Sequence, residues 1–214
     1  MALTGFDPEV VSTSITGITS AYSELIQAIG SDMQTKFVNG MVQNWACKEA
    51  QKFFTDALKP SVDGLNTSTD TVFTSVVDAM NSAAQGWAAQ TQADYTPVSF
   101  TAQAFKADVS GIQENIGGVR GIDLAGANEV AGTLPTIASS AANALSKAKN
   151  AVANCGFLGA DQASNLQTSL GTIETKINEA TTELTTQVKD AIATSVTNYG
   201  DLAGQVATAF NANS

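Results

Sequence analysis

The feature that most constrains the fold is a repeat of apolar residues in the last quarter of the chain. From residue 166 to residue 184 they recur at alternating steps of four and three, and the stripe continues to residue 199. This spacing puts the apolar side chains on one face of a helix and is typical of antiparallel helical bundles. It predicts a final helix over about 158–210. The stripe consists of Leu166, Leu170, Ile173, Ile177, Ala180, Leu184, Val188, Ile192, Val196 and Tyr199.

Three earlier segments have apolar residues at similar steps and predict helices over about 8–39, 45–93 and 135–153. Short polar or glycine-containing turns separate the first helix from the second and the third from the fourth. The sequence therefore predicts an all-α fold, an elongated antiparallel four-helix bundle built from two helical hairpins.

Local signals set the expected ends of the first two helices. Asp7 can cap the first helix, and Pro8 suits its first turn. Asn39-Gly40 is expected to end that helix, because both residues tolerate a left-handed backbone. Pro60 should kink or interrupt the second helix near Leu58, since proline cannot donate a helical hydrogen bond.

The chain divides into two hairpins and a linker, and the hairpins are expected to pack as one bundle. Residues 1–95 form the first hairpin, residues 96–134 the linker, and residues 135–214 the second hairpin. Within the linker, residues 100–116 can form a helix with Phe105, Val109, Ile112 and Ile116 on one face. Glycines then predict a broken helix or a loop, and they match no phosphate-binding motif.

The hairpins resemble each other in sequence. A shift of 112 residues places Trp45 on Phe157, Leu58 on Leu170, and Trp87 on Tyr199. The match favours duplication of one hairpin. The alternative is that any two helices with a seven-residue repeat align at some offset.

The composition argues against enzyme activity and zinc binding, and against nucleic acid or an anionic membrane as a partner. The chain has no histidine, which removes the usual general base and the commonest zinc ligand. The net charge is −10, with a single arginine and dispersed lysines, so neither nucleic acid nor an anionic membrane is an expected partner. Charged residues make up 14% of the chain, compared with roughly 25% in an ordinary soluble domain. We therefore expect no enzyme activity, no cofactor, no metal and no small-molecule substrate.

A family resemblance rests on the segment Trp45-Ala46-Cys47-Lys48-Glu49-Ala50, followed by Phe53 and Phe54. A helix, a tight turn with Trp-x-small, and an aromatic residue on the next helix resemble the WXG100 (ESAT-6-like) proteins. Phe157-Leu158-Gly159-Ala160 would be a degenerate second copy, so the chain is similar to a WXG100 dimer fused into one polypeptide. Two departures are that Cys47 replaces the motif glycine and that the family's Tyr-x-x-x-Asp/Glu tail is absent.

The resemblance implies hairpins that pair into four-helix bundles and are exported by type VII secretion without a cleaved signal. The amino terminus lacks the basic start and apolar stretch of a secretory signal. No apolar run approaches the ~20 residues of a membrane span. The functional hypothesis is a secreted or cell-surface protein that binds a protein partner. The alternative is a self-assembling structural subunit of a filament, virion or surface array, in which case a cytoplasmic or virion location applies.

The predicted hairpin tips contain the candidate site residues Trp45, Cys47, Phe157 and Gly159. Trp45 and Phe157 either close the ends of the core or display aromatic rings to a partner. A short connection near residues 95–98 would place both tips at one end, where a disulfide between Cys47 and Cys155 is geometrically allowed. If the tips lie at opposite ends, as in WXG100 dimers, the two thiols cannot pair. Two free, buried thiols are the other alternative.

Overall fold

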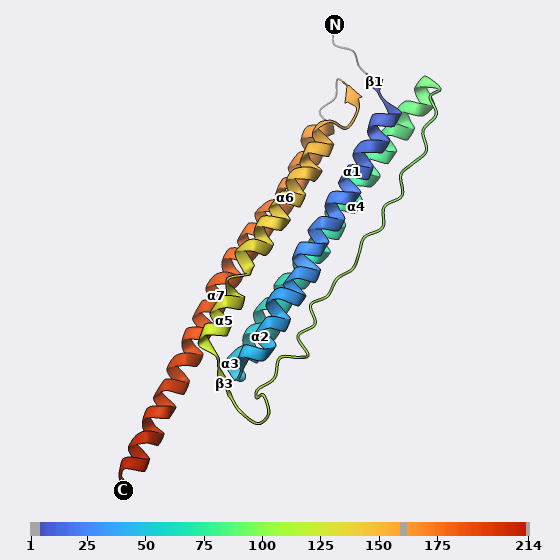
Figure 1. The fold of residues 1–214 in the computed structure, drawn as a ribbon. Helices are drawn as coiled ribbons and strands as arrows, with labels where there is room; N and C mark the ends of the chain where they lie inside the picture. Colours follow the sequence, from blue (N-terminus) through green and yellow to red (C-terminus); the bar gives the residue numbers. More distant parts are fainter. Residues whose placement is uncertain (1–4, 159–161, 213–214) are drawn as a thin grey trace.

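Long helices dominate the computed structural model, which describes residues 5–158 and 162–212 (Figure 1). The prediction of a mostly helical chain is confirmed. Four two-residue strands lie near the two ends of the molecule. The elements in order are β1 (Gly5–Phe6), α1 (Pro8–Ile26), η1 (Gln27–Val38), α2 (Asn39–Asn44), β2 (Trp45–Ala46), α3 (Lys48–Lys52), η2 (Phe53–Leu58), α4 (Lys59–Thr91), β3 (Gly121–Ile122), α5 (Leu124–Ala131), α6 (Leu134–Ala153), β4 (Phe157–Leu158) and α7 (Gln162–Ala212), where η denotes a π-helical stretch.

The first long arm joins α1, η1 and α2 into one uninterrupted helix. Asp7 caps it, because its carboxylate accepts the backbone N–H groups of Glu9 and Val10, both at 3.1 Å. The predicted end at Asn39-Gly40 is wrong, since helix continues to Asn44. Gly40 serves close packing instead: a Cβ there would lie 3.0 Å from the side chain of Val130 on α5.

The second arm joins α3, η2 and α4. Pro60 does not break it, but the backbone changes from π to α geometry just before this residue. Proline cannot donate a helical hydrogen bond, and Pro60 lies in the first turn of α4, where this donor is least needed. The predicted interruption near Leu58 is therefore a change of helical geometry rather than a gap.

The predicted helix over residues 100–116 is wrong. Residues 93–112, here called the strap, contain no helix: they are irregular and largely extended, with a turn at residues 110–111. The strap runs along the molecule, from the end of α4 to the opposite end of the molecule (Figure 1). Side chains of the first hairpin satisfy the strap's backbone: Asn81 bonds both the N–H and the C=O of Val98, each at 3.0 Å. Gln34 does the same for Asp108, at 2.9 and 2.8 Å.

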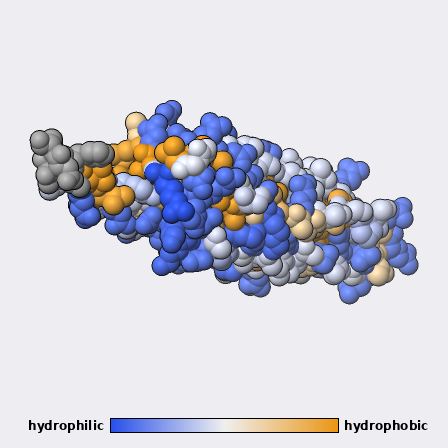
Figure 2. Space-filling model, turned by 90° about the horizontal axis from the view of Figure 1, so that it is seen from below, coloured by the Kyte–Doolittle hydropathy of each residue, from blue (hydrophilic) through white to orange (hydrophobic). Residues whose placement is uncertain are grey.

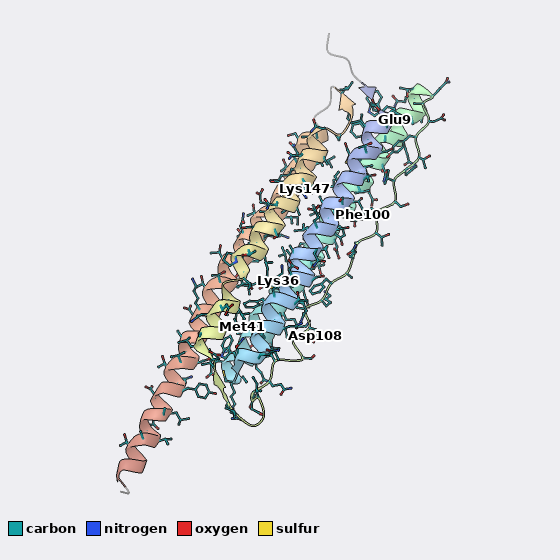
Figure 3. The ribbon with its side chains drawn as sticks, viewed as in Figure 1. Glu9, Lys36, Met41, Phe100, Asp108 and Lys147 are labelled. Carbon is teal, nitrogen blue, oxygen red and sulfur yellow. The ribbon has the colours of Figure 1, made fainter. Side chains whose placement is uncertain are left out.

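A third backbone anchor lies at Ala107, whose N–H donates to Asp63 at 2.8 Å and whose C=O accepts from Lys59 at 2.7 Å. These bonds replace the ones a helix would supply, which explains why an extended strap prevails over the helical spacing. Figure 3 shows Phe100 and Asp108 on the strap alongside the first arm. Phe100 packs edge-on against Tyr22, with ring centroids 4.9 Å apart.

The strap delivers the chain to the end opposite the start of α1, so the two hairpin tips lie at opposite ends of the molecule (Figure 1). A glycine turn follows, with Gly117 and Gly118 at positive φ. The expected broken helix then appears as α5 and α6, separated at Gly132-Thr133. The α1–α6 contact is close: a Cβ on Gly17 would meet the Cβ of Ala151 at 3.4 Å.

The buried side chains form two clusters, one toward each end of the molecule. The first includes Tyr22 and Phe73, and the second includes Trp45 and Phe54. Most of the predicted stripe of α7 is buried in one cluster or the other, with Leu170, Ile173 and Leu184 at most 2% exposed.

Candidate functional site

Each hairpin tip pairs with the short segment that leads into the other hairpin. Trp45 of β2 lies opposite Ile122 of β3, and Phe157 of β4 lies opposite Phe6 of β1. A backbone bond extends each pair: Asp123 N–H donates to the Asn44 carbonyl at 2.7 Å, and Asp7 N–H donates to the Gly156 carbonyl at 2.9 Å. The two ends therefore repeat one arrangement.

The lead-in segments share a sequence pattern that the predicted 112-residue repeat does not include. Gly5-Phe6-Asp7 and Gly121-Ile122-Asp123 both place an aspartate directly before a helix. Asp123 caps α5 by accepting the N–H groups of Ala125 and Gly126 at 3.1 and 3.2 Å, as Asp7 does for α1. The glycine-apolar-aspartate triplet is the sequence pattern from which the equivalence of these segments can be recognised. It repeats after 116 residues, whereas the tips match after 112, so one fixed shift does not align both.

Trp45 lies inside the core at the first tip. Its side chain is fully buried, and its Nε1–H donates to Ser195 Oγ of α7 at 3.0 Å. The rings of Phe53 and Phe54 lie 6.0 and 6.2 Å from it. Trp45 thus closes the end of the core and presents no surface to a partner.

Cys47 contacts the same hydroxyl, with its Sγ 3.5 Å from Ser195 Oγ. Just beyond, Asn198 of α7 donates to Glu49 at 2.9 Å and ties the tip to the second hairpin. The backbone amide of Glu49 itself, at the start of α3, is the largest of the influences that lower the pKa of its carboxyl. Burial, followed by the nearby Cys47 and Glu49, raises the pKa of Tyr199.

The second tip is more open. Phe157 is half-buried, and the side chain of Leu158 is 45% exposed. Phe6 of the paired lead-in segment stacks on Trp87, with ring centroids 6.4 Å apart. Gly159 lies outside the described residues.

The disulfide between Cys47 and Cys155 is not formed. Both cysteines are free and buried, and they belong to tips at opposite ends of the molecule. Of the alternatives that the sequence left open, the structure has free, buried thiols at opposite ends, because the linker is an extended strap and not a short connection that would bring the tips together.

An open groove of ≈ 480 Å³ lies beside the first tip, between α3–η2 and α7. Phe53, Ala57 and Ala191 supply its apolar lining, and Lys48, Glu49, Lys52 and Asp56 supply its charged groups. Two lysines and two carboxylates give no net charge, so the groove has no preference for an anion or a cation. Its lining suits a protein side chain better than a charged metabolite.

Three other kinds of functional feature were considered within the described part of the chain: a metal site, a membrane span and a glycosylation site. No group of three or more His, Cys, Asp or Glu side chains there is placed to hold a metal ion. No helix in the described ranges has the length and apolar character needed to cross a membrane. Asn66 begins a formal glycosylation triplet, but its side chain is 1% exposed and faces the core.

Comparison of the chain with known proteins finds no matching family model, no matching curated protein and no matching solved structure.

Proposed function

We propose that the chain is a non-enzymatic helical protein similar to WXG100 type VII secretion substrates and acts by packing against a protein partner. In this proposal the two hairpins are duplicated copies that form one antiparallel four-helix bundle, equivalent to a WXG100 dimer in a single chain. Export through a type VII system, without a cleaved signal, follows from the same resemblance.

One observation carries the proposal: the hairpins are related end for end. Their tips lie at opposite ends, and each tip pairs with the lead-in segment of the other hairpin. An arrangement with opposite tips is the one expected of a WXG100 dimer. The matching aspartate caps at Asp7 and Asp123 add local support for duplication.

Because Trp45 is buried, a partner surface near the first tip must lie on the outside of the bundle and not on the tip aromatic ring. The groove lined by Phe53 is one such surface.

The experiment is to follow a tagged chain in its source organism, comparing cells with and without the secretion ATPase. Appearance of the intact protein in the medium only when the ATPase is present is the expected result. A cytosolic marker must stay in the cells, and retention of the chain in both strains would overturn the export role.

A second candidate function, a structural subunit of a filament, virion or surface array, is favoured by the chemistry of the outer faces. Many exposed threonine and serine hydroxyls donate to the carbonyl four residues earlier on their own helix. Such hydroxyls need less water, so faces built from them can pack laterally at lower desolvation cost. Electron microscopy of concentrated protein tests this role; ordered filaments or arrays are expected, and isolated particles at every concentration count against it.

A further inference from the structure

The two buried clusters meet at one level of the bundle, here called the waist. The cluster that contains Trp45 is called the first-tip cluster, and the one that contains Tyr22 is called the second-tip cluster. Along a long helix, the buried apolar residues pass from one cluster to the other at the waist. The residues on either side of this change are Ile29 and Met33 on η1, Val62 and Phe73 on α4, and Ile177 and Leu184 on α7.

Packing between the two clusters is incomplete at the waist. A small cavity of ≈ 20 Å³ lies there, and its lining comes from η1, α4, α6 and α7 and from both clusters. A void leaves the atoms around it without contacts on one side, so the dispersion attraction between the clusters is reduced. The lining includes Ile29, Met33, Val62, Ile137, Ile177 and Leu184.

Helix α4 also places two buried polar side chains at the waist. Asn66 and Thr69 lie between Val62 and Phe73 in the sequence and are at most 1% exposed. Asn66 Nδ2 donates to the Val62 carbonyl at 3.0 Å, but neither Asn66 Oδ1 nor Thr69 Oγ1 has a hydrogen-bond partner among the described residues. A buried polar atom without a partner destabilises the closed bundle, and water can bond it once the waist opens.

The backbone is less regular toward the first tip than toward the second. The π-helical stretch η1 crosses the waist, η2 lies beyond it, and α5 is separated from α6 at Gly132-Thr133. Figure 2 looks at the molecule from the first-tip end and shows hydrophobic residues at its surface. Large apolar residues there that are at least 37% exposed include Ile116, Val119, Leu124 and Val196. These features make the first-tip end the one that opens more readily.

We propose that the waist is a seam at which the bundle opens in two parts, so that the first-tip end opens while the second-tip end stays closed. The cavity and the two unpaired oxygens weaken the contact between the clusters at this one level. The groove between α3–η2 and α7 belongs to the end that opens, and its walls separate when that end opens. The waist therefore acts as a conformational switch for this surface. The inference does not rest on the proposed export or partner role.

Native-state hydrogen exchange of the full chain tests the two-part opening. In the proposed scheme, amides of residues 50–58 exchange when the first-tip end opens, and amides of residues 15–25 exchange only when the whole bundle unfolds. The test compares two variants, Val76→Ala in the second-tip cluster and Val188→Ala in the first-tip cluster. They are matched, because both valines are at most 1% exposed and the 112-residue shift places one on the other.

Val76→Ala should speed exchange of residues 15–25 at least fivefold and of residues 50–58 less than twofold, because the second-tip cluster stays intact when the first-tip end opens. Val188→Ala should speed both sets at least fivefold, because both kinds of opening disrupt the first-tip cluster. Equal acceleration of both sets by Val76→Ala would show one cooperative unit and overturn the proposal. The mirror-image result would overturn the choice of end. Unchanged circular dichroism spectra establish that both variants are folded.

A second experiment tests the seam itself. Thr69→Val replaces the unpaired hydroxyl by a methyl group of similar size, so it should slow exchange of residues 50–58 at least threefold and raise the urea midpoint of unfolding. Ser14→Ala is the control, because the Ser14 hydroxyl is also buried but donates to the Asn154 carbonyl at 3.1 Å, so its loss should lower the midpoint. Faster or unchanged exchange of residues 50–58 in Thr69→Val would refute the seam.

Discussion

Replacing Ser195 by alanine should destabilise the protein, because the buried indole N–H of Trp45 would lose its hydrogen-bond acceptor. The Ser195 hydroxyl is fully used: it accepts from Trp45 Nε1 at 3.0 Å and donates to the Ala191 carbonyl at 2.9 Å. Both side chains are fully buried, so water cannot replace the lost acceptor. An unsatisfied buried donor costs about 1–3 kcal/mol of unfolding free energy. The serine-to-alanine gain in helix propensity offsets at most about 0.5 kcal/mol of this.

A double-mutant cycle separates the hydrogen bond from packing. Trp45→Phe removes the donor, so Ser195→Ala in that background leaves no unpaired N–H. There the loss of unfolding free energy caused by Ser195→Ala should be smaller than in the native background by at least about 1 kcal/mol. Free energies come from urea unfolding followed by far-ultraviolet circular dichroism. Ser169→Ala is the control, because the Ser169 hydroxyl makes the same backbone bond on an exposed face of α7. Additivity within about 0.5 kcal/mol would refute the coupling.

Three further predictions concern the strap, a buried phenol and the caps. Gly30→Ala should speed protease cleavage within the strap, because the new Cβ would lie 2.9 Å from the ring of Phe105. Gly64→Ala is the control, because its Cβ meets nothing within 4 Å and should stabilise the helix by up to ~1 kcal/mol. Burial, and next the hydrogen bond to a carboxylate, raise the pKa of Tyr22 above its ordinary value. The unfolded phenol therefore ionises first, and stability should fall as pH rises above ~10, a slope that Tyr22→Phe should reduce in urea titrations at several pH values. Asp7→Ala and Asp123→Ala should each cost about 1 kcal/mol in urea unfolding, and a cost at one site alone would contradict the equivalence of the two ends.

The sequence predicted the helices well because their apolar stripes are long and regular. The repeat in α7 from Leu166 onward is the clearest, and its inner members pack into the core. The turns at Trp45 and Phe157 also fall where the sequence placed them. Local patterns of this kind are enough to locate elements whose burial decides their conformation.

The strap could not be predicted, because its spacing resembles a helix. Phe105, Val109 and Ile112 fall at helical steps, yet the segment contains no helix. Its conformation depends on side chains such as Asn81 and Gln34, which are distant in sequence and bond its backbone. The relative placement of the tips depends on this strap, so the sequence alone could not decide whether Cys47 and Cys155 lie close enough to pair.

The strap also makes hairpin pairing independent of protein concentration. The second arm rises roughly 65 Å from end to end, and an extended chain needs about 20 residues to return that distance. A linker of this reach holds the second hairpin at a high effective concentration beside the first, whereas two separate chains would have to meet by diffusion. Each half is then free to diverge without losing its partner. The polar side chains that form hydrogen bonds with the strap backbone all belong to the first half of the chain; they include Asn81, Asp63 and Gln34.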